Sequence, residues 1–88
     1  MEIILIAINE WDPIGFFPMA PKDEYMNEIK KIYEYLNAIP NVTEEKLAKK
    51  INEIFFISFG TDVYIEDTEQ CLNVAKYIIH EFRYIDET

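Results

Sequence analysis

Serine, cysteine and histidine, the residues of the common catalytic dyads and triads, are rare in this sequence. Apart from its threonines and tyrosines, the chain has one serine, Ser58, one cysteine, Cys71, and one histidine, His80. Nucleophilic catalysis needs a base and an orienting group within hydrogen-bond reach of the nucleophile. Cys71 and His80 are expected on one helix, separated by roughly 13 Å along its axis, so they cannot touch. We therefore expect Cys71 to be a small buried apolar residue and predict no catalytic residue.

Metal and cofactor sites are not predicted either. Structural zinc takes about four Cys or His ligands, and the chain has two such residues in total. The acids Asp62, Glu66, Asp67 and Glu69 lack the alternating pattern of a calcium loop. Glu-x-x-His pairs are absent, and two isolated glycines cannot build a nucleotide-binding loop. The predicted cofactor set is empty.

Carboxylates are the one abundant chemical group. Seventeen Asp and Glu residues stand against eight Lys and Arg residues, which gives a formal net charge of −9. The adjacent pairs 23–24, 44–45 and 86–87 diverge on a helix, so general acid–base catalysis is only an alternative interpretation. The charge disfavours binding to nucleic acid and to anionic membranes. It permits a basic protein partner, or it serves solubility alone.

Four segments must position these residues. With 88 residues and half of them apolar, the chain is expected to form one domain over residues 1–88. Residues 3–11 fit either a buried strand or a short helix; we expect a helix, because no other segment offers a strand partner. A second helix is predicted to start at Pro21, with Asp23 and Glu24 in its first turn, and to end at Pro40.

The remaining two helices carry clear end signals. The third is predicted to begin after the N-cap Thr43 and to stop at Gly60. Asp67 is the expected N-cap of the fourth, whose apolar stripe has 4-3-4-3 spacing from Cys71 onward. Between them, Val63 and Ile65 are expected to point inward from an extended connection. The predicted fold is all-α, a small bundle of three main antiparallel helices plus a short N-terminal helix.

Aromatic and apolar side chains are numerous for so small a body. They imply either an unusually aromatic core or a self-association surface, and the second interpretation predicts a homodimer. The residues concerned include Phe16, Phe17, Met19, Phe55, Phe56, Phe59 and Tyr64.

The segment around the only tryptophan has two interpretations. Residues 11–15 read WDPIG, and PKDEY follows at 21–25. As a structural corner, the aspartate caps a turn, the glycine takes a conformation that other residues avoid, and the tryptophan anchors the corner in the core. As a binding edge, an aromatic and acidic patch would contact a basic partner. The candidate partner-binding residues are Trp11, Asp12, Asp23, Glu24 and Tyr25.

The same motifs carry a family resemblance. WDPIG, PKDEY, the Leu47/Ile51 helix and the entry Glu69-Gln70-Cys71 resemble the YugE-like family of small bacterial proteins of unknown function. That resemblance implies an all-helical fold with three main helices and no assigned activity. The run at residues 16–19 is more hydrophobic than the family leads us to expect. The two motifs are also similar to those of small acidic immunity proteins, which would imply neutralisation of a basic toxin domain.

The termini and the single cysteine bear on location. The apolar run at the N-terminus contains Glu2, lacks a basic stretch and ends at Asn9, so it fits neither a signal peptide nor a membrane span. One cysteine cannot form an internal disulfide. We expect a complete cytoplasmic chain that is not an enzyme and acts through protein–protein contact.

Overall fold

The computed structural model of the chain describes residues 2–17 and 24–86. It contains four helices, α1 (Glu2–Trp11), α2 (Met26–Ala38), α3 (Glu44–Phe59) and α4 (Thr68–Asp86), and the described residues include no strand. The all-α prediction is confirmed, and the ambiguous N-terminal segment is a helix. Its helical spacing decides the matter, because Ile4, Ala7 and Ile8 fall on one face and are buried there.

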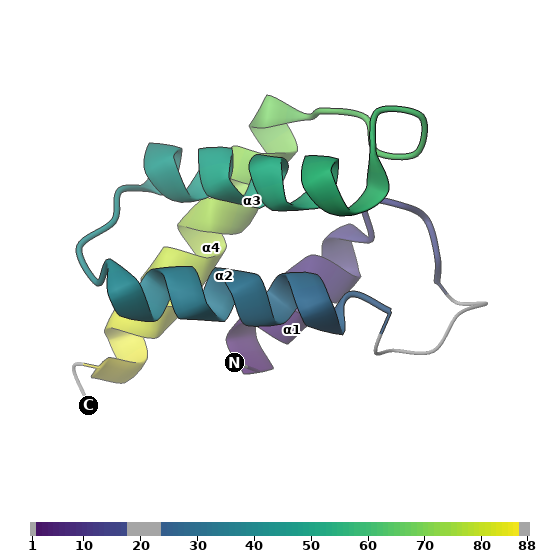
Figure 1. The fold of residues 1–88 in the computed structure, drawn as a ribbon. Helices are drawn as coiled ribbons and strands as arrows, with labels where there is room; N and C mark the ends of the chain where they lie inside the picture. Colours follow the sequence, from purple (N-terminus) through teal and green to yellow (C-terminus); the bar gives the residue numbers. More distant parts are fainter. Residues whose placement is uncertain (1, 18–23, 87–88) are drawn as a thin grey trace.

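The helices lie in two layers. Figure 1 shows α2 and α3 side by side, running in opposite directions, with α4 crossing behind them on a diagonal. Helix α1 packs against both α2 and α4. The antiparallel arrangement predicted for all three main helices is not confirmed, because the diagonal course of α4 departs from it.

The core forms where the apolar stripes of the four helices meet. Each helix contributes residues spaced three or four apart, so that one face is buried and the other meets solvent. The residues with no exposed surface include Ile4, Ile8, Tyr25, Ile29, Ile32, Leu47, Ile51, Phe55, Ala75 and Ile78.

Three of the predicted helix ends are confirmed. The Thr43 hydroxyl accepts a hydrogen bond from the backbone N–H of Lys46 at 3.3 Å. The Asp67 carboxylate accepts one from the N–H of Gln70 at 3.1 Å. Gly60 follows α3 with a φ of 77°. These signals are local, because each cap bonds to a backbone group three or four residues away.

The predicted start of α2 is wrong. The helix begins at Met26, after Tyr25, which makes no side-chain capping bond. Glu24 lies in the preceding turn and not in the first turn of the helix. Pro21 and Asp23 lie outside the described residues. The start is late because the Tyr25 side chain is drawn into the interior, where its hydroxyl bonds to Asp12.

The connection between α3 and α4 also differs from the prediction. Val63 and Ile65 point outward, with 51% and 81% of their surfaces exposed, and Tyr64 between them is 2% exposed. The predicted extended connection is wrong at residues 61–63, which form a turn: the N–H groups of Val63 and Tyr64 both donate to the Gly60 carbonyl, at 3.4 and 2.9 Å. In a turn, the alternation of a strand does not decide which side chains face the core. Tyr64 is buried because its ring is the larger apolar surface and its hydroxyl finds a partner inside, the side-chain Oδ1 of Asn52, to which it donates at 2.6 Å.

Candidate functional site

Asp12 is the centre of the turn that follows α1. Its carboxylate accepts hydrogen bonds from the N–H groups of Phe16 at 2.9 Å and Phe17 at 3.1 Å, and from the Tyr25 hydroxyl at 2.6 Å. The Tyr25 oxygen in turn accepts the N–H of Ile14 at 3.1 Å. Asp12 has a φ of 47°, a left-handed conformation that aspartate tolerates better than most residues.

The Asp12 carboxyl is held deprotonated and the Tyr25 hydroxyl is held protonated. Burial acts to raise the pKa of Asp12, but the hydrogen bonds from Tyr25, Phe17 and Phe16 outweigh it, so the pKa lies below its ordinary value. Burial and the bond to the Asp12 carboxylate raise the pKa of Tyr25 well above its ordinary value. A carboxylate thus accepts from a neutral phenol, which is a charge-assisted and therefore strong hydrogen bond.

Seven aromatic rings join this corner to the end of α3. The Tyr25 ring packs against Phe55 of α3, with 5.7 Å between ring centroids, and against Phe16 of the corner, with 5.4 Å. Trp11 lies 5.4 Å from Phe55 and 6.4 Å from Tyr64, edge-on to both. The members of this aromatic cluster are Trp11, Phe16, Phe17, Tyr25, Phe55, Phe59 and Tyr64.

The structure shows how the predicted partner-binding residues are used inside the molecule. Trp11 is half-buried in the aromatic cluster, the Asp12 carboxylate is engaged by three donors, and Tyr25 is fully buried. Glu24 is exposed, and Asp23 lies outside the described residues. Trp11, Asp12 and Tyr25 therefore have a sufficient structural role, and partner contact by this segment stays a prediction.

The α3–α4 connection, residues 61–67, exposes apolar and acidic side chains together. We call it the acidic loop. Val63 and Ile65 are exposed, and so are the three acids Asp62, Glu66 and Asp67 around them. No Lys or Arg occurs between residues 51 and 75. A partner approaching this loop meets negative charge and two branched aliphatic side chains.

Internal bonds hold the acidic loop in one conformation. The N–H of Tyr64 donates to the Gly60 carbonyl at 2.9 Å, and its hydroxyl donates to Asn52 at 2.6 Å. The same hydroxyl lies 3.4 Å from the Cys71 sulfur, and the ring stacks on Phe55 at 5.8 Å. Tyr64 thus fastens the middle of the loop to both α3 and α4 while its two neighbours face solvent.

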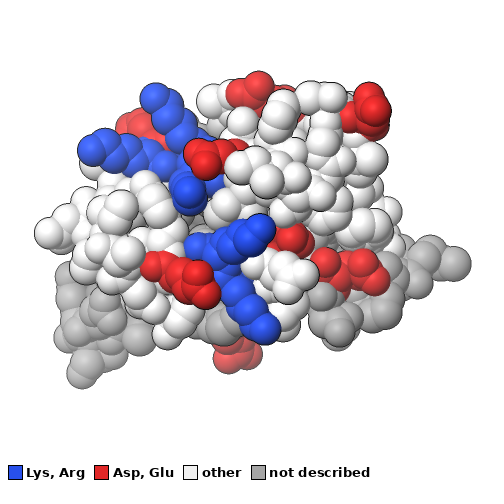
Figure 2. All heavy atoms as spheres, viewed as in Figure 1, with Lys and Arg blue, Asp and Glu red and all other residues white. Residues whose placement is uncertain are grey.

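The excess negative charge lies away from the α2–α3 pair. Residues 26–59 contain five lysines and five glutamates, so all of the excess lies outside them. Figure 2 shows the basic side chains over α2 and α3, whereas the upper right, where Figure 1 places the α3–α4 connection, shows acidic and uncharged atoms only. The protein is therefore charge-segregated, and the acidic loop belongs to its negative part.

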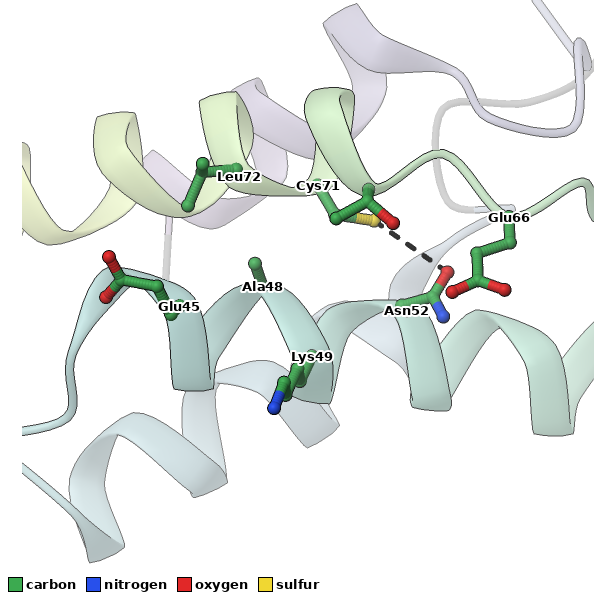
Figure 3. A pocket seen from close by; sticks show the side chains of 8 residues that line it. Glu45, Ala48, Lys49, Asn52, Glu66, Cys71 and Leu72 are labelled. Atoms are coloured by element: carbon green, nitrogen blue, oxygen red, sulfur yellow. Dashed lines mark hydrogen bonds between the residues drawn. The ribbon is translucent and has the colours of Figure 1, made fainter.

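A pocket of about 210 Å³ lies between α3 and α4 beside the acidic loop. Figure 3 shows Cys71 and Leu72 on α4 facing Ala48 and Asn52 on α3, with Glu66 at one end and Glu45 at the other. The eight lining residues are Glu45, Ala48, Lys49, Asn52, Glu66, Thr68, Cys71 and Leu72.

Cys71 is buried beside this pocket, as expected. It is 1% exposed, and burial raises the pKa of its thiol, although the hydrogen bond with Tyr64 acts in the opposite direction. A protonated, enclosed thiol is a poor nucleophile. Ser58 and His80, the other two residues considered for catalysis, are both exposed. Among the described residues no group of three or more His, Cys, Asp or Glu side chains is placed to hold a metal ion.

Sequence reasoning missed the acidic loop. The available signal was the run of acids at 62, 66, 67 and 69 within a stretch free of Lys and Arg. The prediction that Val63 and Ile65 point inward leaves no apolar surface at this loop, so the acids alone do not indicate a site. None of the helices in the described part of the chain combines the length and the apolarity that a membrane span requires.

A family model matches most of the chain. The sequence model of a family described as a domain of unknown function (DUF1871) matches residues 3–81. No curated protein and no solved structure matches the chain significantly.

Proposed function

The chain belongs to the DUF1871 family, a family of unknown function, and we propose that it is a non-enzymatic protein that binds a basic protein partner through the acidic loop. The observation that carries the proposal is the outward position of Ile65, 81% exposed among carboxylates, beside the anchored Tyr64.

The exposed aliphatic side chains supply the affinity in this proposal. Burying an isoleucine that is otherwise exposed contributes about 1.5–3 kcal/mol, so Ile65 and Val63 together can anchor an interface. Because Tyr64 already fixes the loop, little conformational entropy is lost when a partner docks.

The carboxylates supply the selectivity. A local excess of negative charge speeds encounter with a basic surface and repels an acidic one. Asp62 and Glu66 flank the two aliphatic residues and are exposed, so they are free to meet cations on a partner. This arrangement combines an apolar centre with a charged rim, the usual anatomy of a protein–protein interface.

The toxin-immunity interpretation is the narrower form of this proposal. It requires the basic partner to be a toxin domain, and the acidic loop is the surface that such a domain would contact. The YugE-like assignment and a cytoplasmic place of action likewise stay predictions.

Affinity capture with matched variants tests the proposal. The immobilised protein is exposed to native lysate, each captured protein is purified, and its affinity is measured by calorimetry at about 50 and 500 mM salt, since salt screens exposed charges. We expect a basic partner that binds roughly tenfold or more weakly to Ile65→Ser, because about 1.4 kcal/mol corresponds to tenfold. Ile57→Ser, which alters an isoleucine 70% exposed on α3, is the control and should bind like the wild type.

Three results would contradict the proposal, and the first two concern a captured partner. One is equal binding of every captured partner by Ile65→Ser and the wild type. The other is binding that does not weaken with salt. The third is capture of no protein other than a second copy of this chain. Sedimentation equilibrium of the wild type and Ile65→Ser then shows whether the acidic loop forms a homodimer, and a homodimer through this loop would overturn the proposal of a basic partner.

A further inference from the structure

We propose that the pocket between α3 and α4 receives one long cationic side chain, a lysine or arginine, from the partner. This inference rests on the proposed function and names the group that the surface recognises.

The size of the pocket fits a single side chain. Pockets that enclose small-molecule ligands and cofactors run to about 300–1,000 Å³. At about 210 Å³ this pocket falls below that range. It is still far larger than a water molecule, whose share of liquid volume is about 30 Å³. One extended amino-acid side chain is the occupant of intermediate size.

The lining suits an aliphatic stem that ends in a positive charge. Ala48 and Leu72 give the pocket apolar walls, and Cys71 adds an uncharged thiol. Lysine and arginine lay their methylene groups along such surfaces and keep the charged end at the rim. These apolar walls offer no positive charge to bind a phosphate group or a carboxylate.

Carboxylates stand at both ends of the pocket. Glu45 and Glu66 are exposed, and Figure 3 shows them at opposite ends of the lining. Lys49 also lines the pocket, but in the same view its ammonium group points away from α4. A partner side chain that lies between α3 and α4 therefore meets negative charge at both ends of the pocket. This favours a positively charged side chain.

The pocket and the acidic loop form one continuous surface. Glu66 belongs to both, and Ile65 immediately precedes it. Tyr64 connects the acidic loop to the pocket, because its hydroxyl bonds to Asn52 and lies against Cys71, both of which line the pocket. A partner that covers Ile65 can therefore place a neighbouring side chain in the pocket.

Titration with single capped amino acids tests this inference without a partner. The probes are N-acetyl-arginine amide, N-acetyl-lysine amide and N-acetyl-citrulline amide, the last being nearly the same shape as arginine but uncharged. The readout is the change in backbone amide chemical shifts of the isotope-labelled protein. We expect saturable shifts at Ala48, Asn52 and Leu72 with the two cationic probes, and weaker binding of citrulline.

Charge variants give the matched control. Glu45→Gln should weaken binding of the cationic probes by about two- to fivefold, the range for an exposed ion pair. Glu34→Gln, which removes an exposed carboxylate on α2 away from the pocket, should leave it unchanged. Equal shifts with citrulline, or shifts that Glu45→Gln does not weaken, would overturn the inference.

The two proposals fail in different ways. If Ile65→Ser weakens the captured partner but Glu45→Gln leaves both partner and probe binding unchanged, the pocket inference is wrong and the proposed function stands. If the cationic probes bind at the pocket but no partner depends on Ile65, the proposed function is wrong.

Discussion

Replacing Tyr25 by phenylalanine tests whether the corner after α1 is held by the bond between Tyr25 and Asp12. The substitution removes the hydroxyl that donates to the Asp12 carboxylate at 2.6 Å and accepts from Ile14 at 3.1 Å. The ring and its contacts with the aromatic cluster remain, so the packing is conserved.

The expected loss follows from the kind of bond. A hydrogen bond to a charged group contributes about 1.5–3 kcal/mol, so we expect the free energy of unfolding to fall by about 2 kcal/mol. For a domain of 60–100 residues each kcal/mol shifts the melting temperature by about 4–8 °C, which predicts a decrease of roughly 8–16 °C. That is a large part of the stability of a small domain.

Urea unfolding followed by circular dichroism measures the change. Tyr77→Phe is the control, because Tyr77 lies on α4 with 41% of its surface exposed. We expect the control to stay within about 0.5 kcal/mol of the wild type, as surface substitutions usually do. If Tyr25→Phe falls within the same limit, the corner does not depend on this bond and our account of it is refuted.

Three further predictions concern other parts of the fold. The pKa of Asp12 lies below its ordinary value of 3.8, so the stability that its carboxylate contributes is complete at neutral pH and is lost as pH falls through the lowered value. In urea unfolding between about pH 6 and pH 3, the difference in free energy of unfolding between the wild type and Asp12→Asn should therefore shrink. A constant difference would contradict this. Gly60→Ala should lower the free energy of unfolding by about 1–3 kcal/mol, because the φ of 77° strains any residue with a Cβ, although the Cβ itself would meet no atom within 4 Å. An unchanged melting temperature in thermal unfolding would show that the turn can relax. Cys71 should react with a thiol reagent slowly in the native protein and quickly in urea, because it is 1% exposed; equal rates would mean that the α3–α4 contact opens readily.

Helix positions could be predicted because their signals are local. Thr43 and Asp67 each bond to an N–H three residues ahead, and Gly60 ends α3 through its own backbone conformation. The apolar stripe that begins at Cys71 is likewise visible from spacing alone, and its burial is confirmed at Cys71, Ala75 and Ile78. Such features depend on neighbours within about one turn.

The corner residues Trp11, Asp12 and Tyr25 were visible in the sequence, but the contacts between them and the rest of the site could not be predicted because they join residues distant in sequence. Asp12 and Tyr25 are thirteen residues apart, and nothing local indicates that the tyrosine turns inward and delays the start of α2. The pocket needs α4 to lie across α3, which spacing within either helix does not specify.

The sequence by itself determined an acidic, all-helical chain, both ends of α3, the start of α4 and the stripes that face the core. Only the tertiary structure decided that Tyr64 is buried and that Val63 and Ile65 face solvent. The physical reason is that the chain turns at residues 61–63, and a turn has no repeating pattern that indicates which side chain is buried. That choice is made by the volume available and by a hydrogen-bond partner twelve residues away, Asn52, for the tyrosine hydroxyl.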